Sequence, residues 1–101
     1  MKLENGTYLV LSGDTTTLAK IETGRGYWVA ESETTLDSIL SGEIIGVWTD
    51  TDTGKVWLDK SRYFDNLDTA LFWAKQWNQL AIWDNANQKE IRLWETYRLR
   101  L

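Results

Sequence analysis

The chain has 101 residues, with 15 acidic and 11 basic side chains, a formal net charge of −4, seven tryptophans, and no cysteine, histidine or proline. The absence of cysteine excludes a disulfide framework, and without cysteine and histidine the usual ligands of zinc, copper and haem are missing. For the same reason we expect no cofactor. Because the length matches one ordinary domain, we expect residues 1–101 to form a single domain.

The beginning of the chain predicts strands joined by tight turns. Residues 7–12 and 15–23 have the alternating apolar pattern of strands and are separated by a Gly-Asp turn. Residues 27–32 follow a glycine-containing turn and form the next predicted strand. In residues 34–42 an acidic residue follows a threonine by three positions and a glycine closes the segment, which indicates one or two helical turns.

The middle of the chain predicts a β-hairpin. Residues 43–50 and 55–61 are rich in β-branched and aromatic residues, and the intervening TDTG supplies an aspartate and a glycine suited to a tight reversal. A three-residue loop pairs Trp48 with Leu58, whereas a loop one residue longer pairs Trp48 with Trp57. The sequence leaves both registers open, because a shift of one residue exchanges the two faces of a strand.

The DTG at residues 52–54 is also the active-site tripeptide of retroviral-type aspartic proteases. In that family an apolar pair precedes the tripeptide and a small residue follows it, whereas here Thr51 precedes and Lys55 follows. An aspartate in a hairpin turn is too solvated to share a proton with a second carboxylate. The same segment lacks the glycine position and closing glutamate of a calcium loop. With no histidine as a general base, we expect neither an enzyme nor a metal site.

Residues 65–80 predict the principal helix, because the apolar period changes there from two to about 3.6. Asp65 and Asp68 are suited to its N-terminus, where Asp65 is the expected cap. Phe72 falls outside the apolar side and is the best candidate for an exposed anchor. The apolar side of this predicted helix consists of Ala70, Trp73, Ala74 and Trp77, flanked by Leu67, Leu71 and Leu80.

The end of the chain predicts two further strands. Residues 80–84 form a short apolar strand, residues 85–88 a turn, and residues 89–101 a long strand whose alternation shifts after Trp94, so that we expect a bulge or an end near Glu95. The whole pattern predicts an α+β fold, in which an antiparallel sheet of about five to seven strands packs against one long α-helix, with a short extra helix.

Seven tryptophans exceed what a core of this size needs. We expect three of them in the core, namely Trp73, Trp77 and Trp83. For the other four, burial and exposure on an open sheet face remain alternatives; these are Trp28, Trp48, Trp57 and Trp94.

Three segments resemble small proteins of bacteria and their phages to which no activity is assigned. The segments are GVWTDTDTGKVWLDKS at 46–61, LDTALFWAKQWNQLAIWD at 67–84 and KEIRL at 89–93, and the resemblance covers about half of the chain. It implies a compact accessory protein of the kind that phages use to bind and block a host component.

The first functional hypothesis is a non-catalytic protein-binding module. Residues 31–68 contain nine acidic and three basic side chains, a net of −6, which favours a host protein with a basic surface, such as a defence enzyme or a nucleic-acid-binding protein. The acidic sign makes direct binding of nucleic acid unfavourable. The expected contact residues are Phe72, Asp50, Asp52, Asp59, Asp65 and Asp68.

Two alternatives remain. One is a small-molecule binder that sequesters a planar, nucleotide-like ligand between tryptophans; its stacking residues are Trp48, Trp57 and Trp94, and its phosphate contacts are Arg25, Lys55 or Arg92. The other is a homodimer formed through the long C-terminal strand. The apolar run at Leu9–Leu11 is too short for a signal peptide or a membrane span, so we expect a cytoplasmic protein without membrane contact.

Overall fold

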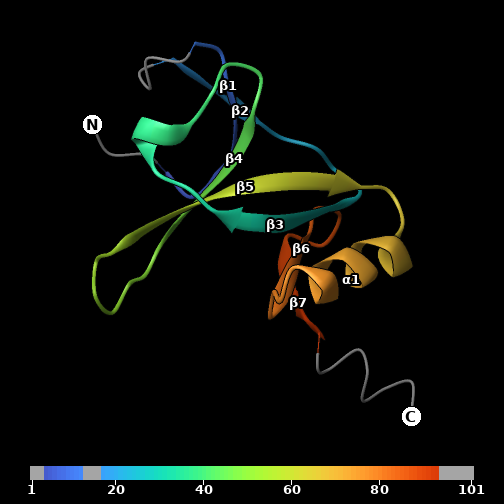
Figure 1. Ribbon diagram of the computed structural model, residues 1–101. Coiled ribbons are helices and arrows are strands. Elements are labelled where there is room, and N and C mark those ends of the chain that lie inside the picture. Colours follow the sequence, from blue (N-terminus) through green and yellow to red (C-terminus); the bar gives the residue numbers. More distant parts are fainter. Residues whose placement is uncertain (1–3, 13–16, 94–101) are drawn as a thin grey trace. The chain divides into compact units, whose positions relative to one another are not determined.

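The computed structural model describes residues 4–12 and 17–93 (Figure 1). Their seven strands form one antiparallel sheet in the order β2-β1-β4-β5-β3-β6-β7, accompanied by one α-helix and one 3₁₀ turn, so the predicted α+β fold is confirmed. In chain order the elements are β1 (Gly6–Val10), β2 (Leu18–Ile21), β3 (Tyr27–Glu33), the 3₁₀ turn η1 (Leu36–Ser38), β4 (Ile44–Thr49), β5 (Val56–Phe64), α1 (Leu67–Gln76), β6 (Ala81–Asp84) and β7 (Lys89–Arg92).

The chain divides into two compact units. The first unit consists of Met1–Glu22 and Ser32–Ser61, and the second of Thr23–Glu31 and Arg62–Leu101. The strands β3 and β5 each contribute residues to both units. Among the described residues no helix is long and apolar enough to cross a membrane.

The first unit has its own apolar core on one face of its strands. Tyr8 of β1 is paired with Ile45 of β4, so that alternate residues of the two strands point to the same side. Ile39, directly after η1, is 2% exposed and belongs to the same buried cluster. The buried residues of this core are Tyr8, Val10, Ile39, Ile45 and Val47.

The hairpin between β4 and β5 has the longer of the two predicted loops. Trp48 is paired with Trp57. The Asp50 amide donates to the Lys55 carbonyl at 2.8 Å, and the Gly54 amide donates to the Asp50 carbonyl at 2.8 Å. Gly54 has a φ of 74°, which a residue without Cβ adopts at little cost. The DTG tripeptide is therefore part of an exposed turn.

Gly46 lies opposite Asp59 in the pairing of β4 with β5. A methyl group on Gly46 would lie 2.8 Å from Asp59 Oδ1 and 2.9 Å from Ser61 Oγ. These polar atoms bond to each other, because the Ser61 hydroxyl donates to Asp59 Oδ1 at 2.9 Å. The glycine thus makes room for a polar pair within the sheet.

We expect Gly46→Ala to lower the free energy of unfolding by about 1–3 kcal/mol, because the added methyl group displaces the Asp59–Ser61 pair. Urea unfolding measures the change. Gly24→Ala is the control, since a methyl group there meets no atom within 4 Å and its φ lies outside the positive region. Equal stability of Gly46→Ala and the unchanged protein would contradict this account.

The helix α1 is shorter at both ends than the predicted 65–80. The cap is Asn66 and not Asp65, because the extended Asn66 places its side-chain oxygen 3.1 Å from the Thr69 amide. At the other end Asn78 has a φ of 56°, and the Gln79 amide donates to the Ala74 carbonyl at 2.8 Å. This left-handed residue with its long backward hydrogen bond ends the helix before Leu80.

The second unit packs α1 on its strands through small residues. Ala70 and Ala74 are both 0% exposed and lie in one cluster with Val29 of β3. The prediction that Trp73 and Trp83 belong to the core is wrong, since their exposed fractions are 39% and 40%. The remaining buried members of the cluster are Leu71, Ile82 and Leu93, and Trp77 is partly buried against it.

Strand alternation explains the exposure of Trp83. Its neighbour Ile82 is buried in the cluster beneath α1, so Trp83 points to the opposite face of β6. There Trp83 is paired with Trp28, which is 8% exposed. The Trp28 ring meets Tyr63 edge to face, with ring centroids 5.4 Å apart.

Several expectations lie outside the described residues. These are the turn at 13–14, the first residues of the strand at 15–23, and the whole chain from Trp94 onward, which includes the expected bulge near Glu95 and the strand proposed to form a homodimer. The strand β7 is described from Lys89 to Arg92.

Candidate functional site

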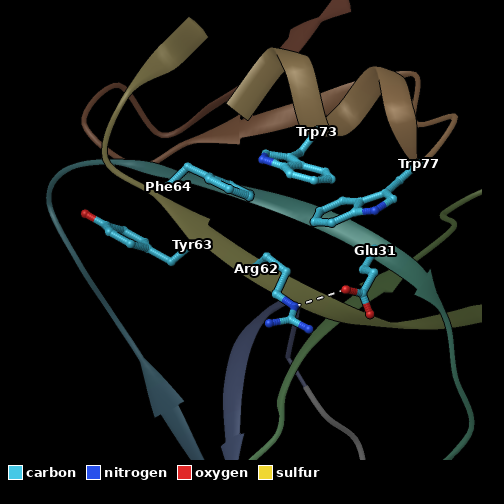
Figure 2. A pocket seen from close by; sticks show the side chains of 6 residues that line it. All are labelled: Glu31, Arg62, Tyr63, Phe64, Trp73 and Trp77. Atoms are coloured by element: carbon cyan, nitrogen blue, oxygen red, sulfur yellow. Dashed lines mark hydrogen bonds and ion pairs between the residues drawn. The ribbon is translucent and has the colours of Figure 1, made fainter. Parts of the chain in front are cut away.

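The second unit contains a shallow, open depression of about 410 Å³ (Figure 2). Four of its six lining residues are aromatic, and an ion pair supplies the charged groups. The side chains come from β3, β5 and α1 and from Trp77, which caps the C-terminus of α1. The lining residues are Glu31, Arg62, Tyr63, Phe64, Trp73 and Trp77.

Four rings form a chain of contacts, and we call them the aromatic run: Phe72 and Trp73 of α1, Trp77 directly after it, and Phe64 of β5. Trp73 and Trp77 are four residues apart, which places their side chains next to each other on a helix, and their ring centroids are 5.3 Å apart. Phe72 meets Trp73 perpendicularly at 5.3 Å, and Phe64 lies 6.2 Å from Trp77. Phe72, at one end of the aromatic run, is 54% exposed. Trp77 and Phe64, at the other end, are half-buried and line the depression.

The packing of α1 explains why Trp73 is exposed and Trp77 is only partly buried. The buried residues of the helix are Ala70, Leu71 and Ala74, so the side that faces the strands is centred between Ala70 and Leu71. Trp73 lies at the margin of this side, and Trp77 lies between it and Ala70. The apolar side predicted from the sequence included both tryptophans and placed Leu71 at its flank, whereas the helix buries Leu71.

The charged groups of the depression are one ion pair. Arg62 Nε lies 3.1 Å from Glu31 Oε1, and the two side chains are 63% and 29% exposed. Arg62 shares its side of β5 with Phe64, and Glu31 shares its side of β3 with the buried Val29. Within residues 4–12 and 17–93, the terminal nitrogens of Arg62 make no hydrogen bond or ion pair.

The residues predicted for protein binding belong to different units. Asp65, Asp68 and Phe72 are exposed residues at and near the start of α1 in the second unit. Asp50 and Asp52 belong to the hairpin turn of the first unit. Asp50 Oδ1 accepts a hydrogen bond from the Asp52 amide at 2.8 Å, so this carboxylate stabilises the turn.

Asp59 is a half-buried side chain of the first unit. Its neighbours are Gly46 across the hairpin and the hydroxyl of Ser61, which is itself 8% exposed. Burial is the main influence on the Asp59 carboxyl and raises its pKa, against the opposing effect of the hydrogen bonds from Ser61 and Gly46. Its environment is therefore that of a group held within the sheet.

We expect Asp59→Asn to stabilise the protein at pH 7, with a benefit that shrinks as the pH falls toward 4. A carboxyl whose folded pKa is raised stabilises the fold fully below its unfolded pKa of about 4, and this contribution is lost as the pH rises through the folded value. Thermal unfolding across this range measures the difference. Asp52→Asn, in the exposed turn, is the control, and a lower stability of Asp59→Asn than of the unchanged protein at pH 7 would refute the argument.

The residues predicted for ligand stacking are also divided between the units. Trp48 and Trp57 face each other across the hairpin of the first unit, where Lys55 Nζ lies 3.7 Å from the centroid of Trp57. Arg25 and Arg92 belong to the second unit; the Arg25 carbonyl accepts from Asn85 Nδ2 at 3.1 Å, and Arg92 Nε lies 3.6 Å from a Glu90 oxygen. Trp94 lies outside the described residues.

None of the six residues that line the depression was predicted as a site residue from the sequence, and Trp73 and Trp77 were expected only in the core. The predicted strand ended at residue 61, whereas β5 continues to Phe64, so Arg62 and Phe64 were assigned to no element. The aromatic pair Tyr63 and Phe64 is the signal for the longer strand, because aromatic residues are enriched in strands. The spacing of four between Trp73 and Trp77 indicates that their rings lie together, but not whether they are buried.

Comparison of the chain with models of known protein families, with curated proteins and with solved structures found no match in any of the three. The resemblance to small proteins of bacteria and phages remains a prediction.

Proposed function

We propose that the chain is a non-catalytic protein-binding module that contacts its partner through the aromatic run and the depression beside it. The supporting observation is the exposure of Phe72 and Trp73, at 54% and 39%, in direct contact with the aromatic lining. Aromatic residues and arginine are the side chains most enriched among those that dominate protein–protein binding energy. Exposed clusters of large apolar side chains are typical of interaction surfaces.

The shape of the surface favours a protein over a small molecule. Small ligands bind in clefts that cover most of their surface, whereas this depression is shallow and open. Phe72 is not part of its lining and extends the aromatic surface beyond it. A protein partner can cover both at once.

Two acidic residues at the start of α1 provide a second contact with the same partner. Asp65 and Asp68 are exposed acidic residues at the start of α1, so basic side chains on the partner complement them. A domain with a net charge of −4 is suited to compete with nucleic acid for such a basic surface. This is the proposed basis for an inhibitor of a host defence or nucleic-acid-binding protein.

We expect Phe72→Ala to weaken partner binding about ten- to thirtyfold while changing the free energy of unfolding by less than about 0.5 kcal/mol. Candidate partners are captured from host lysate and identified by mass spectrometry. Each purified candidate is then titrated against both proteins by calorimetry, and urea unfolding measures stability. Phe72→Ala leaves the buried face of α1 unchanged, which is the reason for the small effect on folding.

Two variants serve as controls. Leu40→Ala removes another side chain that is 65% exposed, in the first unit, and should leave binding unchanged. Leu71→Ala removes a side chain that is 3% exposed and should cost about 2–5 kcal/mol of stability. A large loss of stability in Phe72→Ala, or equal binding by Phe72→Ala and the unchanged protein, would overturn the proposal.

A further inference from the structure

We infer that the depression receives a segment of the partner protein in which an aromatic side chain is next to an acidic one, with the ring against Trp73 and Trp77 and the carboxylate on Arg62. This inference rests on the proposed function and specifies the chemistry of the partner at that site.

The Arg62–Glu31 pair presents a donor edge toward an incoming group. A guanidinium has five N–H donors in one plane, and the bond from Nε to Glu31 at 3.1 Å restricts that plane. The terminal nitrogens then form a fork that matches the two oxygens of a carboxylate. Glu31 thus acts as a positioning residue for Arg62.

The different exposure of Arg62 and Glu31 favours an acidic over a basic side chain of the partner. Arg62 is 63% exposed, whereas Glu31 is 29% exposed and already bonded to Arg62. A basic side chain of the partner would have to reach the less accessible group and compete with an arginine of the same chain. An acidic side chain reaches the more accessible group without displacing anything.

The arrangement of Trp73 and Trp77 determines how the aromatic side chain of the partner binds. Trp73 and Trp77 have centroids 5.3 Å apart at an interplanar angle of 32° and are in contact. An incoming ring therefore packs against the two indoles and Phe64 and does not insert between them. Aromatic pairs prefer such offset or edge-to-face contacts.

The open shape limits what can occupy this site. A free planar acid would leave much of its surface in water, whereas a side chain within a protein segment is held by the contacts of that segment with Phe72 and with the rest of the surface. The acid on Arg62 is a single contact, separate from the basic residues that face Asp65 and Asp68.

The test uses three blocked dipeptides as probes: N-acetyl-Asp-Phe-amide, its Asn-Phe analogue and its Lys-Phe analogue. Proton–nitrogen NMR spectra follow the indole N–H signals of Trp73 and Trp77, assigned with Trp73→Phe and Trp77→Phe. We expect the Asp-Phe probe to shift both signals and to bind about three- to fivefold more tightly than Asn-Phe, as an exposed charge pair allows. Because the net charge of −4 repels an acidic probe, such a preference reports on Arg62.

Arg62→Gln should abolish the preference for Asp-Phe over Asn-Phe. Arg92→Gln is the matched control, since Arg92 also pairs through Nε with a glutamate of the second unit and is 54% exposed but does not line the depression. The inference is overturned if Asn-Phe or Lys-Phe binds as tightly as Asp-Phe, if none of the probes shifts the two signals, or if free 1-naphthoate binds more tightly than the peptides.

The outcome separates this inference from the proposed function. A partner that loses affinity with Phe72→Ala but not with Arg62→Gln would leave the proposed function in place and refute the acidic contact. A partner that binds equally well with and without Phe72→Ala would refute the proposed function. An Arg62-dependent preference for the Asp-Phe probe in the same experiments would still leave the acidic contact in place.

Discussion

The close contact of α1 with its strands determines where the tryptophans of the second unit lie. Ala70 and Ala74 bring the helix against Val29, and all three residues are 0% exposed. Because protein interiors are packed at the density of organic crystals, the space between helix and strands that alanines fill has no room for an indole. Trp73 and Trp77 therefore lie along the margin of the helix.

Because of this packing, Trp73 is exposed and Trp77 is only partly buried, although the sequence pattern predicts both for the core. The indole rings contact Phe72 on one side and Phe64 on the other, and the continuation of β5 places Arg62 beside Glu31 in the same depression. Four contiguous rings with one ion pair provide apolar area and directional hydrogen bonding, which are the properties of a surface that holds a partner.

The acidic residues serve more than one purpose. Asp50 stabilises the hairpin turn, and Asp59 is held within the sheet beside Gly46. Asp84, which is 4% exposed, accepts a hydrogen bond from Asn87 Nδ2 at 2.7 Å, and this bond is the main reason that its pKa lies below the usual value. The roles of several acidic residues are thus structural, and the exposed pair Asp65 and Asp68 carries the electrostatic part of the proposed function.

The sequence by itself determined the class and order of the elements, because the periods of strand and helix and the chemistry of turns are local properties. It also indicated that Phe72 is exposed, since that residue falls outside any apolar side of the helix. Only the tertiary structure decided the rotation of α1, the pairing of Trp48 with Trp57 and the meeting of Arg62 with Glu31. These depend on contacts between residues far apart in the chain, and on which side chains fill the available volume, which a periodic pattern does not specify.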